Sequence, residues 1–386
     1  MTGPGCGRAT VLAIGAAMAA SVAACGGPAA SSAGAPEAGT VASEGGSGAL
    51  DAGGAADATS AVDGAGGEEG SPPPEVDGAA GGATATLSFL SGGTYSLYAS
   101  VGGGTPHVVQ LDTGSIGLYV PRAVLGSDAQ VSATATCSIT YVSSGNTLSG
   151  HTATAAIALL GSKASGDLPS PPTTVPMSLC AVDDPSFSGG MMGVGFGRGA
   201  MPDPSRNVLL EMADVKSGAM RAGYILSTHP SPHLQIGVSG ATLAGFQTVP
   251  LTPDPGGSGD WVATSLRGCL SVPSAPSFGQ PCGGLLVDTG VPECLLWGPS
   301  DATLGGAIPA GATAVPAGVA LQITAPAGSG VLAYGFVVGT AADSPSAVDV
   351  RSASAFSINT GRALLVDYDY AFDAQAGTVG FRRMVP

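Results

Sequence analysis

Two copies of one short polar motif occur in a chain that is otherwise rich in small and apolar residues. They are Asp112-Thr113-Gly114, after the run Val109-Gln110-Leu111, and Asp288-Thr289-Gly290, after Leu285-Leu286-Val287. A single Asp-Thr-Gly is typical of any strand that ends in an Asx turn. Two copies, each directly after an apolar run and about half of the strand-rich region apart, are much more specific.

Two facing aspartates have the chemistry to hydrolyse an amide bond. The ionised carboxylate takes a proton from a water molecule, while the protonated carboxyl donates to the carbonyl oxygen of the amide. Because like charges a few ångströms apart resist ionising together, the pair holds one proton between its members. We therefore predict that Asp112 and Asp288 are catalytic. The residues expected to position them are Thr113, Gly114, Ser115, Thr289 and Gly290.

The elements that must position these motifs are predicted to be strands. Strand-like runs separated by turn signals follow one another from residue 85 onward, WVATSL at residues 261–266 among them. Gly (63) and Pro (30) are abundant, which suits many short strands better than a helix-rich fold. One helix is expected at residues 207–215, where apolar residues recur at helical spacing. The sequence thus predicts an all-β fold.

From residue 90 to residue 386, the order of motifs resembles that of the pepsin-like aspartic proteases. The resemblance rests on Tyr95–Pro106, Asp112–Ser115 with Leu118–Pro121, Ile139–Tyr141 with Gly145 and Gly150, Gly190–Gly195, Leu234–Gly237, Val249–Leu251, Asp288–Gly290 with Leu295–Pro299, and Ala371–Asp373 with Val379–Phe381. It implies a fold of two similar lobes, residues 85–235 and 236–386, each supplying one aspartate to a central cleft that takes a peptide or protein substrate. It also implies a monomeric aspartic endopeptidase that needs neither a cofactor nor a metal.

The resemblance assigns roles to two tyrosines. Tyr141 falls on the tyrosine of the hairpin flap that closes over substrate, although an ordinary cross-strand aromatic residue would look the same in sequence. Tyr119 stands where the family usually has Trp, and we expect it in the pocket wall and core.

Two departures from the family pattern lie near the second aspartate. Val291 stands where Ser or Thr is usual, and Asn359-Thr360-Gly361 replaces an apolar-apolar-Gly segment. If Asp288 loses a hydrogen-bond donor, the pKa of the pair should rise and the pH optimum should be less acidic. The same departures keep two non-enzymatic alternatives open. One is an inactive binding or inhibitor module, and the other is a structural envelope lipoprotein.

The beginning of the chain has the pattern of an export signal. Arg8 precedes an apolar stretch at residues 9–23, and Val22-Ala23-Ala24-Cys25-Gly26 resembles a bacterial lipobox. The resemblance implies that residues 1–24 are removed and that Cys25 is acylated, which would anchor the protein to the cell envelope at the outer membrane or cell surface. An ordinary secretory signal with a chance cysteine is the alternative.

The segment 25–84 is predicted to be a disordered tether. After Cys25 it is built from Gly, Ala, Ser, Pro and acidic residues, with few large apolar side chains to bury. Beyond it, Cys137, Cys180, Cys269, Cys282 and Cys294 allow at most two disulfides in an exported protein. Cys137–Cys180 is the natural pair in the first half, and the second bridge would join two of the later three.

Composition and missing motifs argue against other functions. The net charge of −15 with only 12 Lys and Arg disfavours nucleic-acid binding, which needs a basic surface. His229 and His233 are separated by prolines that prevent a shared helix face, so a metal pair is not expected. The sequence has neither a His-Glu-x-x-His zinc-protease motif nor a Gly-x-Ser-x-Gly serine-hydrolase motif.

Overall fold

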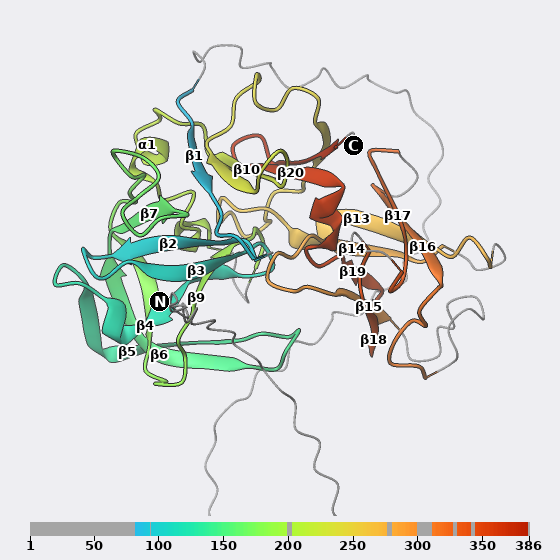
Figure 1. Cartoon of the computed structure of the whole chain (residues 1–386), viewed down its shortest axis with the longest axis horizontal. Helices are drawn as coiled ribbons and strands as arrows, with labels where there is room; N and C mark the ends of the chain where they lie inside the picture. Colours follow the sequence, from blue (N-terminus) through green and yellow to red (C-terminus); the bar gives the residue numbers. More distant parts are fainter. Residues whose placement is uncertain are drawn as a thin grey trace, which may run out of the picture. The chain divides into compact units, whose positions relative to one another are not determined.

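The computed structural model describes residues 82–92, 94–198, 203–275, 280–298, 311–326, 330–340 and 344–384. The predicted signal segment and Cys25 lie outside these ranges, as does the predicted tether up to residue 81. Strands dominate the described residues, and the one α-helix among them, α1 (Ala213–Lys216), has four residues. The all-β prediction is confirmed (Figure 1).

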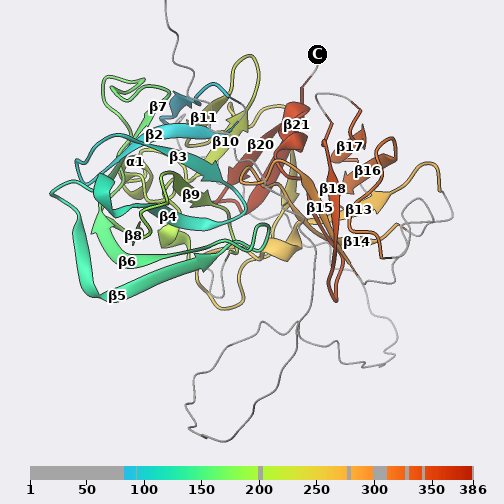
Figure 2. The ribbon, with the colours of Figure 1, turned by 60° about the horizontal axis from the view of Figure 1, so that its bottom comes forward.

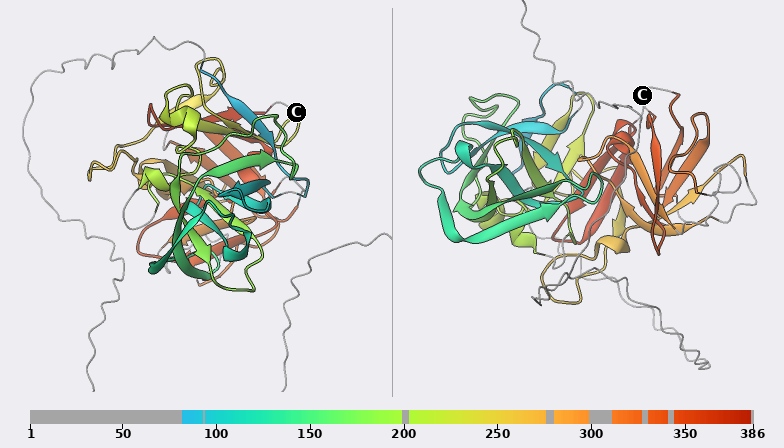
Figure 3. Two further views of the ribbon diagram at one scale, coloured as in Figure 1. Left: turned by 90° about the vertical axis from the view of Figure 1, so that its left-hand side faces the viewer. Right: turned by 90° about the horizontal axis from the view of Figure 1, so that it is seen from below.

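The first motif lies in an eight-stranded sheet formed by the first half of the chain. Its strands, in spatial order, are β5 (Gln130–Thr140), β6 (Thr147–Ala155), β8 (Met177–Val182), β4 (Ile116–Pro121), β9 (Gly190–Val194), β3 (His107–Asp112), β2 (Ser96–Val101) and β7 (Ile157–Gly161). Strands β5 and β6 form a long hairpin, drawn in green-blue in Figures 2 and 3. A short 3-10 turn, η1 (Arg122–Val124), follows β4.

The second motif lies next to a seven-stranded sheet formed by the second half. Its strands, in spatial order, are β17 (Leu332–Val337), β16 (Ala320–Ala325), β13 (Arg267–Ser271), β14 (Cys282–Leu286), β19 (Ser357–Asn359), β15 (Cys294–Gly298) and β18 (Val348–Ser352).

A third sheet of six strands draws on both halves of the chain. In spatial order it contains β1 (Ala85–Ser88), β11 (His233–Ile236), β10 (Gly223–Ser227), β20 (Tyr368–Asp373), β21 (Thr378–Arg383) and β12 (Gln247–Pro250). Figure 1 shows β10 and β20 between the strands of the other two sheets. The expected lobe boundary at residues 235 and 236 falls inside β11, so it cuts a strand of this shared sheet.

The two larger sheets repeat one arrangement around the motifs. Strand β3, which ends at Asp112, runs parallel to β9, and β9 runs antiparallel to β4, which runs parallel to β8. In the second sheet, β14, β19, β15 and β18 make the same three pairings in the same order. The register matches as well, because Gln110 pairs with Met191 while Leu286 pairs with Asn359. The structure therefore places the two aspartates at equivalent positions of two similar sheets.

Two expectations about local structure were wrong. At residues 207–215 the helix is reduced to α1, because Met212 forms a bridge with Thr174 and the Asn207 side chain accepts from the Leu209 N–H in an Asx turn. These contacts occupy backbone groups that a longer helix would need. The expected strand at residues 261–266 contains instead the 3-10 turn η3 (Ala263–Ser265), where the Ser265 hydroxyl donates to the Val262 carbonyl. The remaining 3-10 turns of the described residues are η2 (Pro204–Arg206) and η4 (Ala363–Val366).

Two disulfides brace strands near the motifs. Cys137–Cys180 joins β5 of the long hairpin to β8, as expected from the sequence. Cys269–Cys282 joins β13 to β14, the strand that leads to Asp288, while Cys294 is a buried free thiol. The predicted limit of two bridges, with one pair among the three later cysteines, is confirmed.

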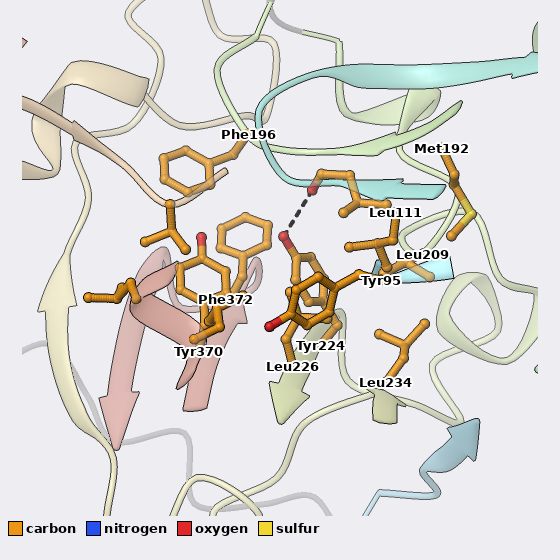
Figure 4. Packing of buried hydrophobic residues seen from close by; sticks show 14 of the residues in the cluster. Tyr95, Leu111, Met192, Phe196, Leu209, Tyr224, Leu226, Leu234, Tyr370 and Phe372 are labelled. Carbon is orange, nitrogen blue, oxygen red and sulfur yellow. Dashed lines mark hydrogen bonds between the residues drawn. The ribbon is translucent and has the colours of Figure 1, made fainter. Parts of the chain in front are cut away.

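Aromatic side chains of the six-stranded sheet, together with Phe196 just after β9, fill the core between the halves. Phe196 stacks on Phe372 with ring centroids 4.9 Å apart, and the edge of Tyr224 meets Phe372 at 5.7 Å. Figure 4 shows these rings together with Tyr370, pointing toward one another. All four are at most 5% exposed, so this aromatic layer stabilises the junction that carries both motifs.

Candidate active site

The two motif loops are joined by reciprocal hydrogen bonds between their threonines. The Thr113 hydroxyl donates to the Val287 carbonyl (2.6 Å), and the Thr289 hydroxyl donates to the Leu111 carbonyl (2.7 Å). Each threonine N–H also donates to the hydroxyl of the other threonine at 3.1 Å. Both residues are at most 2% exposed. Buried hydrogen bonds of this kind are costly to break, so they hold the two loops in one fixed arrangement.

The carboxyl groups carry matching sets of donors. The Gly114 N–H donates to Asp112 Oδ1 (2.8 Å), and the Ser115 hydroxyl donates to Asp112 Oδ2 (2.5 Å). In the second loop, the Gly290 N–H donates to Asp288 Oδ1 (2.9 Å). The donor to Asp288 Oδ2 is the side-chain amide of Asn359, at 2.7 Å.

Each motif glycine lies directly against the opposite carboxyl group. A Cβ at Gly114 would be 2.5 Å from Asp288 Cγ, and a Cβ at Gly290 would be 2.7 Å from Asp112 Oδ1. Only a residue without a side chain allows this approach. The structure thus brings together all seven residues that the sequence assigned to the aspartate pair and its support.

The electrostatics favour one shared proton. Burial raises the pKa of Asp112, and the negative charge of Asp288 raises it further, whereas the hydrogen bonds from Ser115 and Gly114 oppose the rise. Exposures of 3% for Asp112 and 6% for Asp288 leave little water to screen the two charges. The pKa at which Asp112 releases its proton therefore lies well above the ordinary aspartate range.

A guanidinium lies near the pair. Burial lowers the pKa of Arg198, while Asp288 and Asp112 favour its charged form. Its Nε is enclosed and has no hydrogen-bond partner among the described residues. Because Arg keeps its proton even so, this side chain supplies a fixed positive charge close to both carboxyl groups.

Tyr141 lies at the turn of the long hairpin, and its side chain interacts with Asp112. Its N–H donates to the Asn146 carbonyl (2.9 Å), and its carbonyl accepts from the Gly145 N–H (2.7 Å). The hydroxyl is buried beside Ser115, and burial together with the charge of Asp112 raises the pKa of Tyr141. The structure therefore brings Tyr141 to the aspartate pair.

The tip of this hairpin also touches the second half of the chain. The Arg351 guanidinium of β18 donates to the Val142 carbonyl at 3.1 Å. The Val142 side chain itself is 77% exposed. The hairpin thus crosses from the sheet that carries Asp112 to the sheet that carries β18.

Tyr119 lies in a small buried cluster beside the hairpin, close to its turn. Its ring is 2% exposed and packs with Cys180, Val182 and half-buried side chains that include Ile139. Its hydroxyl accepts from the Arg206 guanidinium at 3.0 Å. The ring therefore supports the hairpin from within the core.

Asn359 is the site residue that the sequence did not identify. The sequence showed that Val291 lacks a hydroxyl and that Asn359 is polar where the pepsin-like pattern is apolar. It gave no sign that Asn359 would contact Asp288 in place of that hydroxyl. The hydrogen bond to Asp288 means that the expected loss of a donor did not occur. The premise of the less acidic pH optimum was therefore wrong.

No group of three or more His, Cys, Asp or Glu residues in the described ranges is arranged to hold a metal ion. Among the same residues, no helix has the length and apolar character needed to cross a membrane.

Comparisons with known proteins support the fold. No protein-family model matches the sequence, and no curated protein matches it either. Among solved structures, the crystal structure of an aspartic proteinase from Irpex lacteus is similar, with a TM-score of 0.54 and 16% sequence identity. The match covers 78% of this chain and 98% of that one. The chain therefore has the bilobal, nearly all-β fold of the pepsin-like aspartic proteinases.

Proposed function

We propose that the protein is an aspartic endopeptidase and that Asp112 and Asp288 are its catalytic residues. The observation that carries this proposal is the buried pair of carboxyl groups, fixed by the reciprocal Thr113 and Thr289 hydrogen bonds. A structural aspartate would gain nothing from a second one against it, because two buried like charges cost stability. Perturbed, paired carboxyl groups of this kind are typical of catalytic sites.

The proposed reaction uses an activated water and forms no covalent intermediate. The ionised carboxylate takes one proton from the water as its oxygen bonds to the peptide carbonyl carbon. The protonated carboxyl gives its proton to the carbonyl oxygen, and a tetrahedral diol results. The carboxyl that took the proton from water then gives it to the amide nitrogen, and the C–N bond breaks. As the new carboxyl group forms, one hydroxyl of the diol gives its proton to the other carboxylate, so the pair again holds one proton.

The proposed substrate is a peptide or unfolded protein segment bound between the two lobes. Tyr141 would cover it and shield the reacting bond from bulk water, because its buried hydroxyl already lies close to Asp112. For substrate to enter, the hairpin tip must leave the Arg351 contact. Opening of the hairpin is then part of each catalytic cycle.

The test is digestion of an unfolded protein by the purified protein across pH 3–8, beside Asp112→Asn and Asp288→Asn variants. We expect cleavage by the native protein, none by either variant, and inhibition by a peptide whose hydroxyl mimics the tetrahedral intermediate. A folded protein that cleaves nothing at any of these pH values would refute the proposal and favour a binding module with a pepsin-like fold.

We also propose that the protein is held at the cell envelope by a lipid on Cys25, followed by the flexible tether. The lipobox-like sequence and the acidic, low-complexity segment support this proposal. Metabolic labelling with a fatty acid tests it. Label should appear in the native chain and be absent from a Cys25→Ala variant, while label-free native protein in the culture medium would contradict it.

A further inference from the structure

The two halves of the aspartate pair receive their outer donor from different places in the fold. In the first sheet, the donor is Ser115, three residues after Asp112. The residue equivalent to Ser115 in the second loop is Val291, which has no polar atom in its side chain. The second donor, Asn359, comes from strand β19 and occupies the register position that Met191 occupies in β9. The repeat thus keeps the hydrogen bond but changes its chemical type.

The orientation of the Asn359 amide is fixed by its other partner. Its Oδ1 accepts from the backbone N–H of Gly361 at 2.8 Å, and an N–H group only donates. The amide nitrogen must therefore face Asp288 Oδ2. Asn359 is 2% exposed, and rotation of its amide would break the hydrogen bonds at both ends, so its orientation is fixed.

This fixed amide distinguishes the two carboxyl groups. Both oxygens of Asp288 face N–H donors, from Gly290 and Asn359, neither of which accepts a proton. Asp112 Oδ1 also faces an N–H, but Asp112 Oδ2 faces the Ser115 hydroxyl, which both donates and accepts. Within these four contacts, only Asp112 Oδ2 has a partner that tolerates a protonated carboxyl oxygen.

We propose that Asn359 is a positioning residue that keeps Asp288 ionised, so that the proton of the resting pair lies on Asp112. This inference rests on the proposed function and assigns the order of its proton transfers. Asp288 takes the proton from water as the oxygen–carbon bond forms, and Asp112 gives its proton to the carbonyl oxygen. The number of protons on the pair is unchanged by this step, which therefore balances.

The charges around the pair agree with this assignment. The two carboxyls face each other, and Arg198 interacts with both. Tyr141 and Tyr224 interact with Asp112, and neither is among the donors of Asp288. For Arg198, Asp288 is the strongest of the favourable charge interactions. Burial and the neighbouring negative charge also raise the pKa of Asp112.

The test replaces Asn359 by the residue at its equivalent position. In Asn359→Met, Asp288 loses a donor to its charged form, and we expect the acidic limb of the kcat/KM profile to move up by about one to two pH units. Adding Val291→Ser to this variant recreates the donor arrangement of the first loop and should restore most of the shift. The matched control, Ser115→Ala, removes the donor from Asp112 instead and should move the acidic limb less.

A second measurement keeps this inference separate from the proposed function. Carboxyl ¹³C NMR titration of the full chain follows the pair without turnover, with signals assigned from the Asp112→Asn and Asp288→Asn variants. The lower of the two apparent pKa values of the pair should rise in Asn359→Met. If Asn359→Met fails to fold, Val291→Ser alone should lower the same value by adding a donor.

Two results would overturn the role of Asn359. One is an unchanged acidic limb and an unchanged lower pKa in folded Asn359→Met. The other is a shift that the added Val291→Ser does not reverse, since loss of packing would explain it. An inactive protein with the expected NMR shift would instead refute the proposed function and leave the role of Asn359 intact.

Discussion

The contact between Gly114 and the opposite carboxyl group gives a sharp prediction. In Gly114→Ala, the new Cβ would lie 2.5 Å from both Cγ and Oδ2 of Asp288. Ordinary contacts begin at 3.4 Å, so the Asp288 carboxyl or the loop must move by about 0.9 Å. The reciprocal hydrogen bonds of Thr113 and Thr289 resist movement of the loops, so most of the displacement should fall on the carboxyl group.

A displacement of this size should be costly for a reaction that passes a proton between two fixed groups. Misplacement by about 1 Å is enough for a loss near 10²-fold, which corresponds to about 2.7 kcal/mol in the activation free energy. We expect kcat to fall by about that factor in Gly114→Ala. Gly290→Ala should fall less far, because its Cβ would be 2.7 Å from Asp112 Oδ1.

The assay is steady-state cleavage of a quenched fluorescent peptide at the optimum pH, with thermal unfolding of each variant as a check on folding. Gly240→Ala is the matched control, since Gly240 is exposed and a Cβ there meets nothing within 4 Å. The control should keep the native kcat. If folded Gly114→Ala kept more than a third of the native kcat, the close packing of this loop against Asp288 could not be what positions the pair.

Three further predictions concern stability and the hairpin. A buried carboxyl with a raised pKa contributes most to folding stability below the ordinary aspartate pKa, and this contribution is lost as the pH rises through the raised value. In urea unfolding, Asp112→Asn should therefore become progressively more stable than the native protein between pH 4 and pH 8. If the unfolding free energies of the two proteins had parallel pH dependences, the buried charge would be contradicted. Replacing both Cys269 and Cys282 by Ala removes a disulfide of sequence separation 13 and should lower the unfolding free energy by about 3 kcal/mol. Adding reductant to this variant should lower the unfolding free energy further only if it also opens the Cys137–Cys180 disulfide. Arg351→Ala removes the contact with the hairpin tip and should increase limited proteolysis within residues 141–146, whereas Arg351→Lys should give an intermediate rate; equal rates in all three proteins would show that the contact does not restrain the tip.

The parts of the site that are local in sequence were predictable. Asp112-Thr113-Gly114 and its second copy each carry their own turn, glycine and hydroxyl, so three consecutive residues identified the site. The alternation of strand-like runs and turns likewise predicted the all-β fold, because side-chain periodicity is a local property.

The contact between Asn359 and Asp288 could not be read in the same way. The two residues are 71 positions apart, and they meet only because β14 pairs with β19. The incorrect helix prediction at residues 207–215 has a similar origin, because Met212 forms a β-bridge with Thr174 instead of continuing a helix. In both places a pairing between segments distant in sequence determined the local structure, and the local residue pattern did not indicate that pairing.

The six-stranded sheet has a consequence for the order in which the protein completes its site during synthesis. Strand β10, from the first half, pairs with β20, and β20 pairs with β21. The aromatic layer between the halves likewise needs Tyr370 and Phe372 from β20. A nascent chain lacking residues 368–383 therefore has both motifs but no finished junction to hold them together. Any activity of the aspartate pair would therefore begin only after β20 and β21 have been synthesised and have paired with β10.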